Sequence, residues 1–322
     1  MDRRTLLAGS AGALALSAMP TARAQSGRPL RLICGFPPGG SIDIVARTLA
    51  EKMREDLGAP VVVDNRPGAG GRLAADLLKN APADGQTVMI CPIVVPVLAP
   101  MVFSRLPYDP KTDFAPVGHV VNFTFGLAVG ADFPARTLPE FIAWIRANPT
   151  KANFGSPAPG SLPHFFGVMI GREAGVDMVH VPYAGGAALA TAIVGGQVPA
   201  GIDVILETLE QHRGGKLRIL ATSGTQRARV LPDVPTFRES GFPNIVATSW
   251  FAMYAPAKTP EPAITAINRA LNRALAAPDV IERFGKLALE PGGGSPADLQ
   301  RIQDADTARW APVVKASGFR GD

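Results

Sequence analysis

The chain has few of the residues that build nucleic-acid and metal sites. Aromatic residues make up 7% of its 322 residues, and beyond residue 24 Lys and Arg form no run. This composition argues against a platform for stacked bases and against a basic nucleic-acid surface. The four histidines form no H-E-x-x-H pattern, and the two cysteines, Cys34 and Cys91, form no C-x-x-C pair. We therefore expect neither a metal site nor a bound cofactor.

Nucleotide-binding and hydrolase motifs are also missing. Residues 68–73 follow a predicted strand but lack the third glycine of G-x-G-x-x-G. The chain contains no G-x-x-x-x-G-K-S/T loop and no G-x-S-x-G turn. The sequence therefore gives no support to a dinucleotide-binding, P-loop or α/β-hydrolase interpretation.

Long hydrophobic runs are absent beyond the N-terminus, so we expect no membrane span there. Residues 1–24 resemble an export signal, with a charged start, an apolar middle and an A-x-A site at Ala22-Arg23-Ala24. The Arg3-Arg4 pair is compatible with twin-arginine export, and Sec export stays equally open. Cleavage after Ala24 predicts a periplasmic protein. It also removes three arginines and one aspartate, which lowers the formal net charge from +5 to +3.

The two cysteines each end a predicted strand. If those strands are neighbours, an exported protein could join Cys34 to Cys91 by a disulfide. Two buried free thiols fit equally well, because a bond between adjacent parallel strands needs a particular geometry.

The first part of the chain alternates strand-like and helix-like segments. Residues 41–57 predict a helix because Val45, Leu49, Met53 and Leu57 recur every four residues, and Gly58 ends it. A second helix is expected over 71–79, and strands over 31–36, 61–63 and 87–91. This βαβαβ order predicts a parallel sheet with helices on its faces.

The middle of the chain repeats this alternation. A capping box, Thr137 to Glu140, opens a helix that stops at Pro149. Further helices are expected over 164–174 and 187–194, and strands over 153–155, 178–181, 200–206 and 217–221. Two helices are expected to close the chain. The first carries the stripe Ile264, Ile267, Leu271 and Leu275, and the second starts at Ser295-Pro296.

Two long extended segments, 118–129 and 246–255, separate these α/β parts. A chain that crosses out and returns in this way builds two α/β lobes joined by two crossing hinge strands. We expect lobe 1 to contain residues 26–122 and 250–322, and lobe 2 to contain residues 123–249.

Four Gly- and Pro-rich loops follow predicted strands, at residues 37–41, 65–71, 156–161 and 182–186. Such loops lie at the carboxyl ends of parallel strands, where α/β proteins bind ligands. The helix N-termini that follow present free N–H groups and favour anions. Each loop alone could be an ordinary turn, but four of them in two lobes favour an anion-binding cleft.

A few single side chains qualify as structural or binding groups. We expect Asp43 to stabilise the first turn of its helix, and Arg47 to pair with Asp43 or Glu51. His164 and Tyr183 could contact a ligand or only support their loops. Asp203 lies in an apolar strand and needs a partner, either a ligand ammonium or a buried backbone group.

The order of several motifs resembles a known family, the periplasmic substrate-binding receptors of tripartite tricarboxylate transporters. The motifs span the mature chain and include Phe36-Pro37-Pro38-Gly39-Gly40, Asn65-Arg66-Pro67-Gly68-Ala69-Gly70-Gly71, Ala83-Asp84-Gly85, His180-Val181-Pro182-Tyr183 and Leu231-Pro232-Asp233-Val234-Pro235-Thr236. The resemblance implies a type II-like periplasmic-binding-protein ("Venus flytrap") fold. Such a monomer closes on a small carboxylate and delivers it to membrane permease subunits.

The resemblance also implies which residues hold the ligand. The expected carboxylate contacts are Phe36, Pro37, Gly40, Ser41, Ser156 and Ser161. Tyr183 and Asp203 are expected to select the far end of the ligand, and His164 is a further candidate.

The chain departs from the family pattern at a few positions. Ala184 stands where Lys or Arg is frequent, Gly167 stands near a frequent acidic position, and Cys34 and Cys91 are unusual. These departures leave open which carboxylate is bound, whether a di- or tricarboxylate, an acidic amino acid or an aromatic acid.

Three functional readings follow from the residues. The first is a non-enzymatic exported receptor that captures a carboxylate between two helix N-termini. The second is a ligand sensor for a membrane signalling protein, which would use the same site. The third is a hydrolase or isomerase with Ser41 or Ser161 as nucleophile and His164 as base, which lacks an orienting acid at a recognised spacing.

Overall fold

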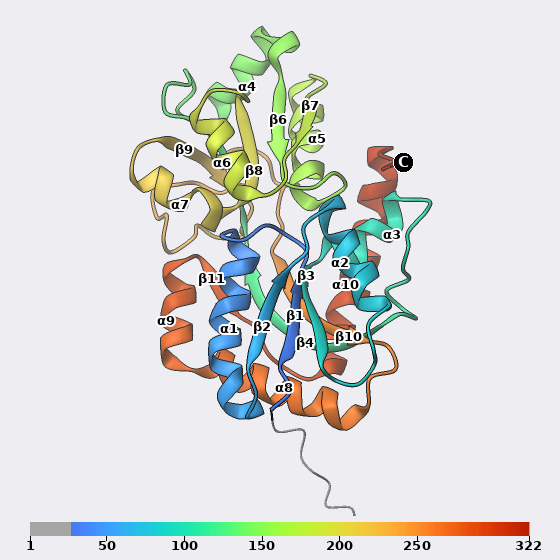
Figure 1. The fold of residues 1–322 in the computed structure, drawn as a ribbon. Coiled ribbons are helices and arrows are strands. Elements are labelled where there is room, and N and C mark those ends of the chain that lie inside the picture. Colours follow the sequence, from blue (N-terminus) through green and yellow to red (C-terminus); the bar gives the residue numbers. More distant parts are fainter. Residues whose placement is uncertain (1–26, 322) are drawn as a thin grey trace, which may run out of the picture.

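The computed structural model describes residues 27–321. The expected export signal and its cleavage site lie outside the described residues. The described chain forms two α/β lobes, one above the other in Figure 1. None of the helices within 27–321 has the length and apolar character needed to cross a membrane.

Lobe 1 is built on a six-stranded sheet with the order β11-β4-β10-β3-β1-β2. β1, β2 and β3 run parallel, whereas β10 is antiparallel to both β3 and β4. The sheet is therefore mixed, with the predicted βαβαβ unit as its parallel part. The strands are β1 (Leu30–Cys34), β2 (Val61–Asn65), β3 (Thr87–Pro92), β4 (Phe114–Phe123), β10 (Ser249–Pro256) and β11 (Leu289–Pro291).

Helices cover both faces of this sheet (Figure 1). The predicted first helix is confirmed residue for residue, and it ends because Gly58 adopts a left-handed conformation at φ 60°. Its stripe from Val45 to Met53 is fully buried. The helices are α1 (Ser41–Leu57), η1 (Ala69–Gly71), α2 (Arg72–Lys79), η2 (Val94–Leu98), α3 (Ala99–Val102), α8 (Glu261–Ala276), α9 (Pro278–Lys286) and α10 (Pro296–Ser317).

Lobe 2 is built on a five-stranded sheet with the order β7-β6-β8-β5-β9. β6, β7 and β8 are parallel, and β5 is antiparallel to β8 and β9. Its strands are β5 (Phe125–Gly130), β6 (Asn153–Ser156), β7 (Val179–Pro182), β8 (Ala200–Val204) and β9 (Leu217–Thr222). Its helices are α4 (Leu138–Ala147), η3 (Pro149–Lys151), α5 (Leu162–Ala174), α6 (Gly186–Val194) and α7 (Ile205–Arg213).

Several elements differ from the prediction, and η2, α3 and β11 were not predicted at all. β8 ends at Val204 rather than Leu206, and the unpredicted helix α7 starts at Ile205. A third helix, α9, lies between the two helices expected near the C-terminus. α7 escaped detection because its first residues are apolar and no side chain caps its start. Of the predicted capping box at Thr137, one bond is present, in which the Thr137 hydroxyl accepts from the Glu140 N–H, while the Glu140 carboxylate accepts from the Arg136 N–H instead of that of Thr137. The predicted cap at Ser295 is confirmed, and there the structure has a full capping box with Asp298.

The lobes are joined by two crossings, from β4 to β5 at Thr124 and from the segment after β9 into β10. Aromatic rings are packed along these crossings. Phe123 contacts Phe125 and Phe251 at centroid distances of 5.5 and 4.5 Å, and Phe125 contacts Phe166 of α5 at 5.6 Å. In β10, the buried Trp250 donates its indole N–H to Asp306 of α10 at 2.7 Å. The hinge therefore lies within an apolar core that is continuous with those of both lobes.

The C-terminal segment makes a third connection between the lobes. Arg172 of α5 donates to the carbonyls of Ala316 and Ser317 at the end of α10, at 2.9 and 3.1 Å. The Phe319 ring packs edge-on against His164, with centroids 4.4 Å apart. Lobe 1 thus reaches α5 of lobe 2 through its last residues.

Strand order places a switch point in each lobe. β1 lies between β2 and β3, and β6 lies between β7 and β8. The connections leave these central strands in opposite directions, which opens a crevice at their carboxyl ends. The loops after β1 and β6, which the sequence singled out, start at these crevices and enter α1 and α5.

Cys34 and Cys91 are free and buried in lobe 1. They lie on the neighbouring strands β1 and β3, where Cys34 is in register with Ile90. Burial raises the pKa of the Cys34 thiol to about 11 and raises that of Cys91 as well. Of the two alternatives left open by the sequence, the structure has the buried thiols.

Candidate ligand-binding cleft

A cavity of about 300 Å³ lies between the lobes. The hinge residues Phe123, Phe125, Ser249 and Phe251 line it, so the hinge forms one wall. Lobe 1 contributes the loop after β1 and residues 92–94. Lobe 2 contributes the loops before α5 and α6, together with Asp203, Val204 and Glu207.

The loop after β1 is held in place by Asp43, which is buried in the first turn of α1. Its carboxylate accepts hydrogen bonds from the Gly39 N–H, the Arg47 side chain and the Asn65 amide, each at 2.9 Å. Burial alone would raise the pKa of Asp43, but these donors hold it below its ordinary value. Gly39 has φ +86°, which favours glycine at this turn. The expected Asp43–Arg47 pair is confirmed.

The N-terminus of α1 receives a carboxylate from the other lobe. The Ser41 backbone N–H donates to Glu207 Oε1 of α7 at 2.6 Å. A Cβ atom added to Gly186, the first residue of α6, would lie 2.3 Å from the Glu207 carboxyl carbon. Glu207 therefore lies where α1 of lobe 1 and α6 of lobe 2 meet. The sequence predicted an anion at Ser41, and in the structure the protein itself supplies one.

Asp203 is the second acid in the cavity wall, and its side chain is 5% exposed. Its Oδ1 accepts from the Val204 N–H at 2.8 Å. Its Oδ2 is buried without a hydrogen-bond partner among the described residues. Burial raises the pKa of Asp203 well above its usual range, and the nearby Glu207 raises it further. Burial likewise raises the pKa of Glu207, although the Ser41 donor opposes this.

Ser249 adds a second unsatisfied polar atom to the same cavity. Its hydroxyl, at the start of β10, is 1% exposed and finds no hydrogen-bond partner within residues 27–321. Buried polar atoms are costly unless they are hydrogen-bonded, so both atoms are suited to a bound ligand or water.

The loop before α5 brings Ser161 to the cavity, but its hydroxyl donates to the Ala158 carbonyl at 2.6 Å. Neither Ser41 nor Ser161 caps its helix with its side chain, and Gly40 is the N-cap residue of α1. The cavity therefore meets these two helix starts mainly through backbone groups.

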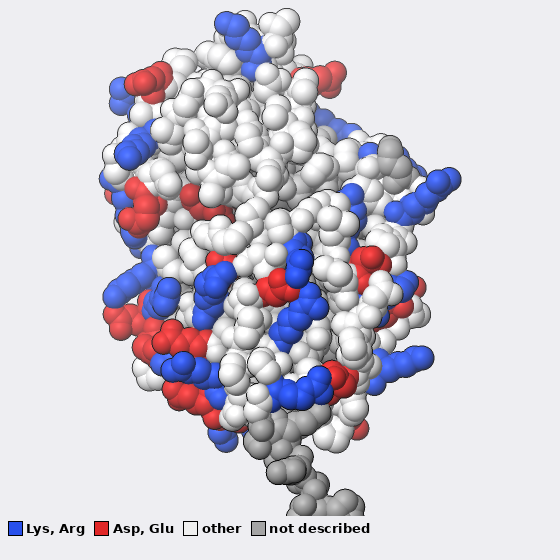
Figure 2. Space-filling view, viewed as in Figure 1, with Lys and Arg blue, Asp and Glu red and all other residues white. Residues whose placement is uncertain are grey.

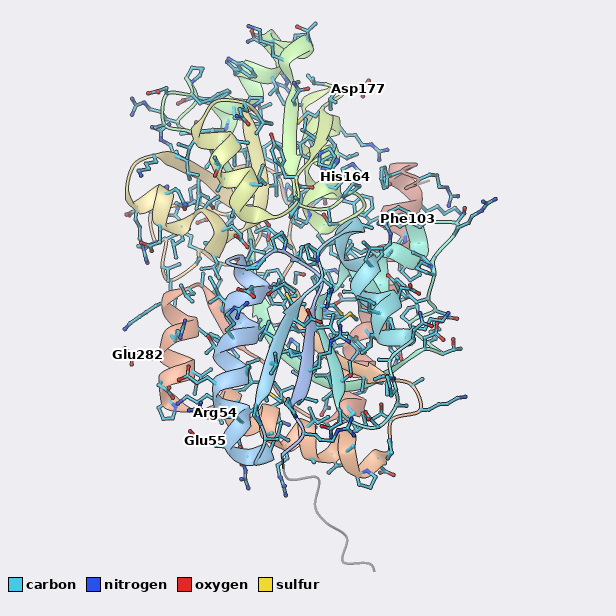
Figure 3. The ribbon with its side chains drawn as sticks, viewed as in Figure 1. Arg54, Glu55, Phe103, His164, Asp177 and Glu282 are labelled. Carbon is cyan, nitrogen blue, oxygen red and sulfur yellow. The ribbon has the colours of Figure 1, made fainter. Side chains whose placement is uncertain are left out.

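Ser156 and His164, which we expected at the ligand, are not among the residues that line this cavity. Ser156 is fully buried, and its hydroxyl lies 2.7 Å from His180 Nε2. His164 Nδ1 accepts from the Gly160 N–H at 2.9 Å, and its ring stacks on His180 with centroids 4.2 Å apart. Figure 3 shows His164 at the base of the upper lobe. It supports the loop before α5, the structural alternative that the sequence left open.

The two stacked histidines are held in their neutral forms. Burial lowers the pKa of both to about 4, and the proximity of His180 adds to the effect on His164. Ser161 and His164 do not make the contacts that the hydrolase reading requires of a nucleophile and its base. Ser161 donates to a carbonyl, and His164 receives a backbone N–H.

Tyr183 lines a neighbouring cavity of about 490 Å³ rather than the first one. A Cβ at Gly155 would lie 2.8 Å from its ring, so the ring packs directly on β6. Phe36, Pro157 and Ala184 line both cavities, which therefore adjoin. Of the expected contacts, Phe36, Pro37, Gly40, Ser41, Ser161 and Asp203 lie in the wall of the first cavity.

The structure adds two residues that the sequence did not reveal, Glu207 and Ser249. Glu207 lies on the unpredicted helix α7, where a surface acid is ordinary. Ser249 is one hydroxyl in an extended segment. No motif marks either residue, and only the pairing of the strands and the packing of α7 bring them to the cleft.

The ionisable side chains of the cavity wall are of one kind. Among its described lining residues, Asp203 and Glu207 are acidic, and no Lys, Arg or His takes part. The outer surface differs, since Figure 2 shows Lys and Arg interspersed with Asp and Glu over the lower lobe. Within 27–321, no cluster of three or more His, Cys, Asp or Glu side chains could hold a metal ion.

Comparisons with known proteins agree with this arrangement. A family model described as "Tripartite tricarboxylate transporter family receptor" matches residues 45–319. This chain belongs to that family. The protein BugT of Bordetella pertussis is 33% identical to this receptor over 306 residues, which cover 95% of this chain and 94% of BugT.

Solved structures show the same two-lobed fold. An R. palustris protein solved with adipate has a TM-score of 0.88 and 31% identity, covering 92% of this chain and 99% of that one. MatC from Rhodopseudomonas palustris, with bound malate, has a TM-score of 0.85 and 31% identity, covering 89% and 99%. The periplasmic binding protein BugD has a TM-score of 0.87 and 31% identity, covering 91% and 98%. The predicted periplasmic-binding-protein fold is confirmed.

Proposed function

We propose that this receptor captures a small carboxylate in the interlobe cleft and releases it unchanged. The observation that carries the proposal is a cavity between the lobes, placed at the switch points of both sheets. The N-termini of α1, α5 and α6 meet it, and their first-turn N–H groups have no partner within the helix. Relatives with adipate and malate support the ligand class.

The closing motion follows from the two hinge crossings. A ligand that touches both lobes stabilises the closed form by its differential affinity for that form. The closed receptor, a monomer in the periplasm, then presents its ligand to the membrane permease subunits of a tripartite tricarboxylate transporter. The export signal of residues 1–24, removed after Ala24, takes it to that compartment.

Thermal unfolding of residues 25–322 with a panel of small carboxylates, neutral sugars and cationic amines tests this function. A ligand at 100 times its Kd adds about 2.7 kcal/mol to the free energy of unfolding, which is a readily measured shift. We expect at least one carboxylate to raise the melting temperature and no sugar to do so. Stabilisation by sugars alone would contradict the proposal.

A pair of variants on α6 locates the site. Ala188 is exposed and lines the cavity, so Ala188→Trp should fill the cleft and abolish the ligand-induced shift. Thr191, also exposed on α6, does not line it, and Thr191→Trp should keep the full shift. An equal loss in both variants would place the ligand elsewhere.

A further inference from the structure

The cleft carries two acidic side chains in its own wall. Asp203 and Glu207 are its titratable side chains among the described lining residues, and no cationic side chain joins them there. The other lining groups are mostly apolar, including Phe123, Phe125 and Phe251. Apolar surroundings screen charge poorly. A second carboxylate on a ligand would therefore lie near two acids with no cationic side chain to offset their repulsion.

Asp203 lines the cavity and has an acceptor atom without a partner. Its Oδ2 is buried without a partner, while the carboxylate is fixed from behind by the Val204 N–H. A fixed, buried carboxylate oxygen with an unused lone pair is suited to an N–H donor of high charge.

Glu207 lies four residues after Asp203, in the first turn of α7, and is held by contacts of its own. Its Oε1 is held by the Ser41 N–H of lobe 1, and its position against Gly186 fixes the rest of the group. Both acids belong to lobe 2, and this contact ties their pair to the start of α1 in lobe 1. Glu207 therefore belongs to the closed site and not to a solvated surface.

We propose that the ligand is a carboxylate that also carries a protonated amine, and that Asp203 and Glu207 form the subsite for its ammonium group. This inference rests on the proposed function. The ammonium donates to the unpartnered oxygen of Asp203 and compensates one negative charge, so the two acids need not both be ionised. The ligand carboxylate then lies at the helix start that Glu207 does not contact, that of α5, beside the Ser249 hydroxyl.

A metal ion suits the pair less well than an amine. Only two carboxylates meet at this point, and no group of three or more ligating side chains exists in the described chain. Calcium and magnesium need six or more oxygen ligands, and the apolar walls do not supply them. An ammonium needs only a few acceptors and tolerates apolar groups around its carbon chain.

The experiment compares ligands that differ in one end group. Adipate, hexanoate and 5-aminopentanoate share a carboxylate on four methylenes and end in carboxylate, methyl and ammonium. Succinate, butanoate and β-alanine form the same series on two methylenes, and leucine is paired with 4-methylpentanoate. Calorimetry and thermal unfolding of residues 25–322 give the affinity of each.

We expect the amine member of at least one set to bind about tenfold or more tightly than its matched partners, as a charge-assisted hydrogen bond implies. In the Asp203→Asn/Glu207→Gln double variant this preference should disappear, and the dicarboxylates should gain affinity. Glu210→Gln is the matched control, because Glu210 is exposed on the same helix and pairs with Arg213. It should keep the wild-type preference.

The possible outcomes separate this inference from the function on which it rests. If a dicarboxylate or a methyl-ended acid binds most tightly, the receptor function stands and the ammonium subsite is wrong. If CaCl2 alone stabilises the protein and Asp203→Asn removes that effect, a metal ion replaces the amine and the inference also fails. If no carboxylate of any set binds, both proposals fail together.

Discussion

At the level of single residues, two kinds of buried polar group surround the cleft. One kind, such as Asp43, has all its hydrogen bonds inside the protein and stabilises a loop. The other kind, Asp203 and Ser249, retains an atom without a partner. The sequence separated these roles only in part. It assigned Asp43 to structure and Asp203 to either role, because a carboxylate in an apolar strand needs a partner in any fold.

The stacked pair His164 and His180 predicts a loss of stability in acid. Both pKa values are lowered from 6.5 to about 4. Between these two values the unfolded chain therefore binds protons at both histidines, whereas the folded chain does not. Their contribution is complete above pH 6.5 and declines as the pH falls toward 4. After allowance for partial exposure, we expect a loss on the order of 2 kcal/mol between about pH 7 and pH 5.

Urea unfolding at a series of pH values measures this loss, and NMR of the histidine ring protons assigns it. Both rings should remain neutral at about pH 5.5. His180→Gln removes one member and serves to identify its signal. Titration of either ring near 6.5 in the folded protein would contradict the prediction.

The buried cysteines predict low thiol reactivity. With the pKa of Cys34 raised to about 11 and that of Cys91 raised too, almost no thiolate forms at neutral pH. We expect the folded protein to react with DTNB only at the rate of unfolding. In guanidinium it should release thiol signal from both cysteines. Absence of signal in the unfolded, unreduced protein would show a disulfide instead.

At the level of elements, the sequence predicted those whose ends and faces carry their own signals. α1 has a repeating apolar stripe, a glycine-rich start and Gly58 at its end, and its bounds were predicted without error. α7 has none of these signals. Its start, Ile205-Leu206, continues the apolar run of β8, so the strand was predicted too long. Because Glu207 lies on that helix, the acidic pair could not be predicted either.

The hydrogen bonds in the loop after β1 predict that replacing Asp43 lowers the free energy of unfolding, because Asp43 positions that loop. Asp43→Ala leaves the Gly39 N–H without its acceptor and removes one of the two acceptors of the Asn65 amide, which also donates to the Phe36 carbonyl of the same loop. We expect a loss of about 2–3 kcal/mol, the range for hydrogen bonds to a charged group. Chemical unfolding measures it, and ligand affinity should also fall although Asp43 does not line the cavity.

Glu51→Ala is the control for this variant, because Glu51 is an exposed acid of the same helix. Its effect should stay within about 0.5 kcal/mol, as for ordinary surface positions. Equal stability of the two variants would mean that the hydrogen bonds of Asp43 do not hold the loop.

At the level of the whole molecule, the lobes are connected by two hinge crossings and by the C-terminal segment, besides the Ser41–Glu207 hydrogen bond across the cleft. The crossings were predicted from two extended segments. The third contact, Phe319 on His164 and Arg172 on the end of α10, was not predicted. The sequence around a single aromatic residue near a chain end does not indicate its packing partner. The contact becomes apparent only when both lobes are folded.

This third contact predicts that the chain end couples the lobes. Phe319→Ala removes a half-buried ring that also lies against the loop before α5, 3.3 Å from a Cβ at Gly160. We expect a loss of about 1–2 kcal/mol, less than for a fully buried phenylalanine. Hydrogen exchange should show faster opening of residues 158–165 in particular. Arg320→Ala, an exposed neighbour, should leave both measurements unchanged.

The position of Trp250 gives the receptor an optical signal of its own. Its ring is buried in the hinge strand β10, directly after Ser249 of the cavity wall, and its indole N–H is bound to Asp306 of α10. Rotation of the lobes about that strand changes the field that the carboxylate of Asp306 exerts on the indole. Ligand capture should therefore be visible as a change in intrinsic fluorescence on the time scale of closure, without any attached dye.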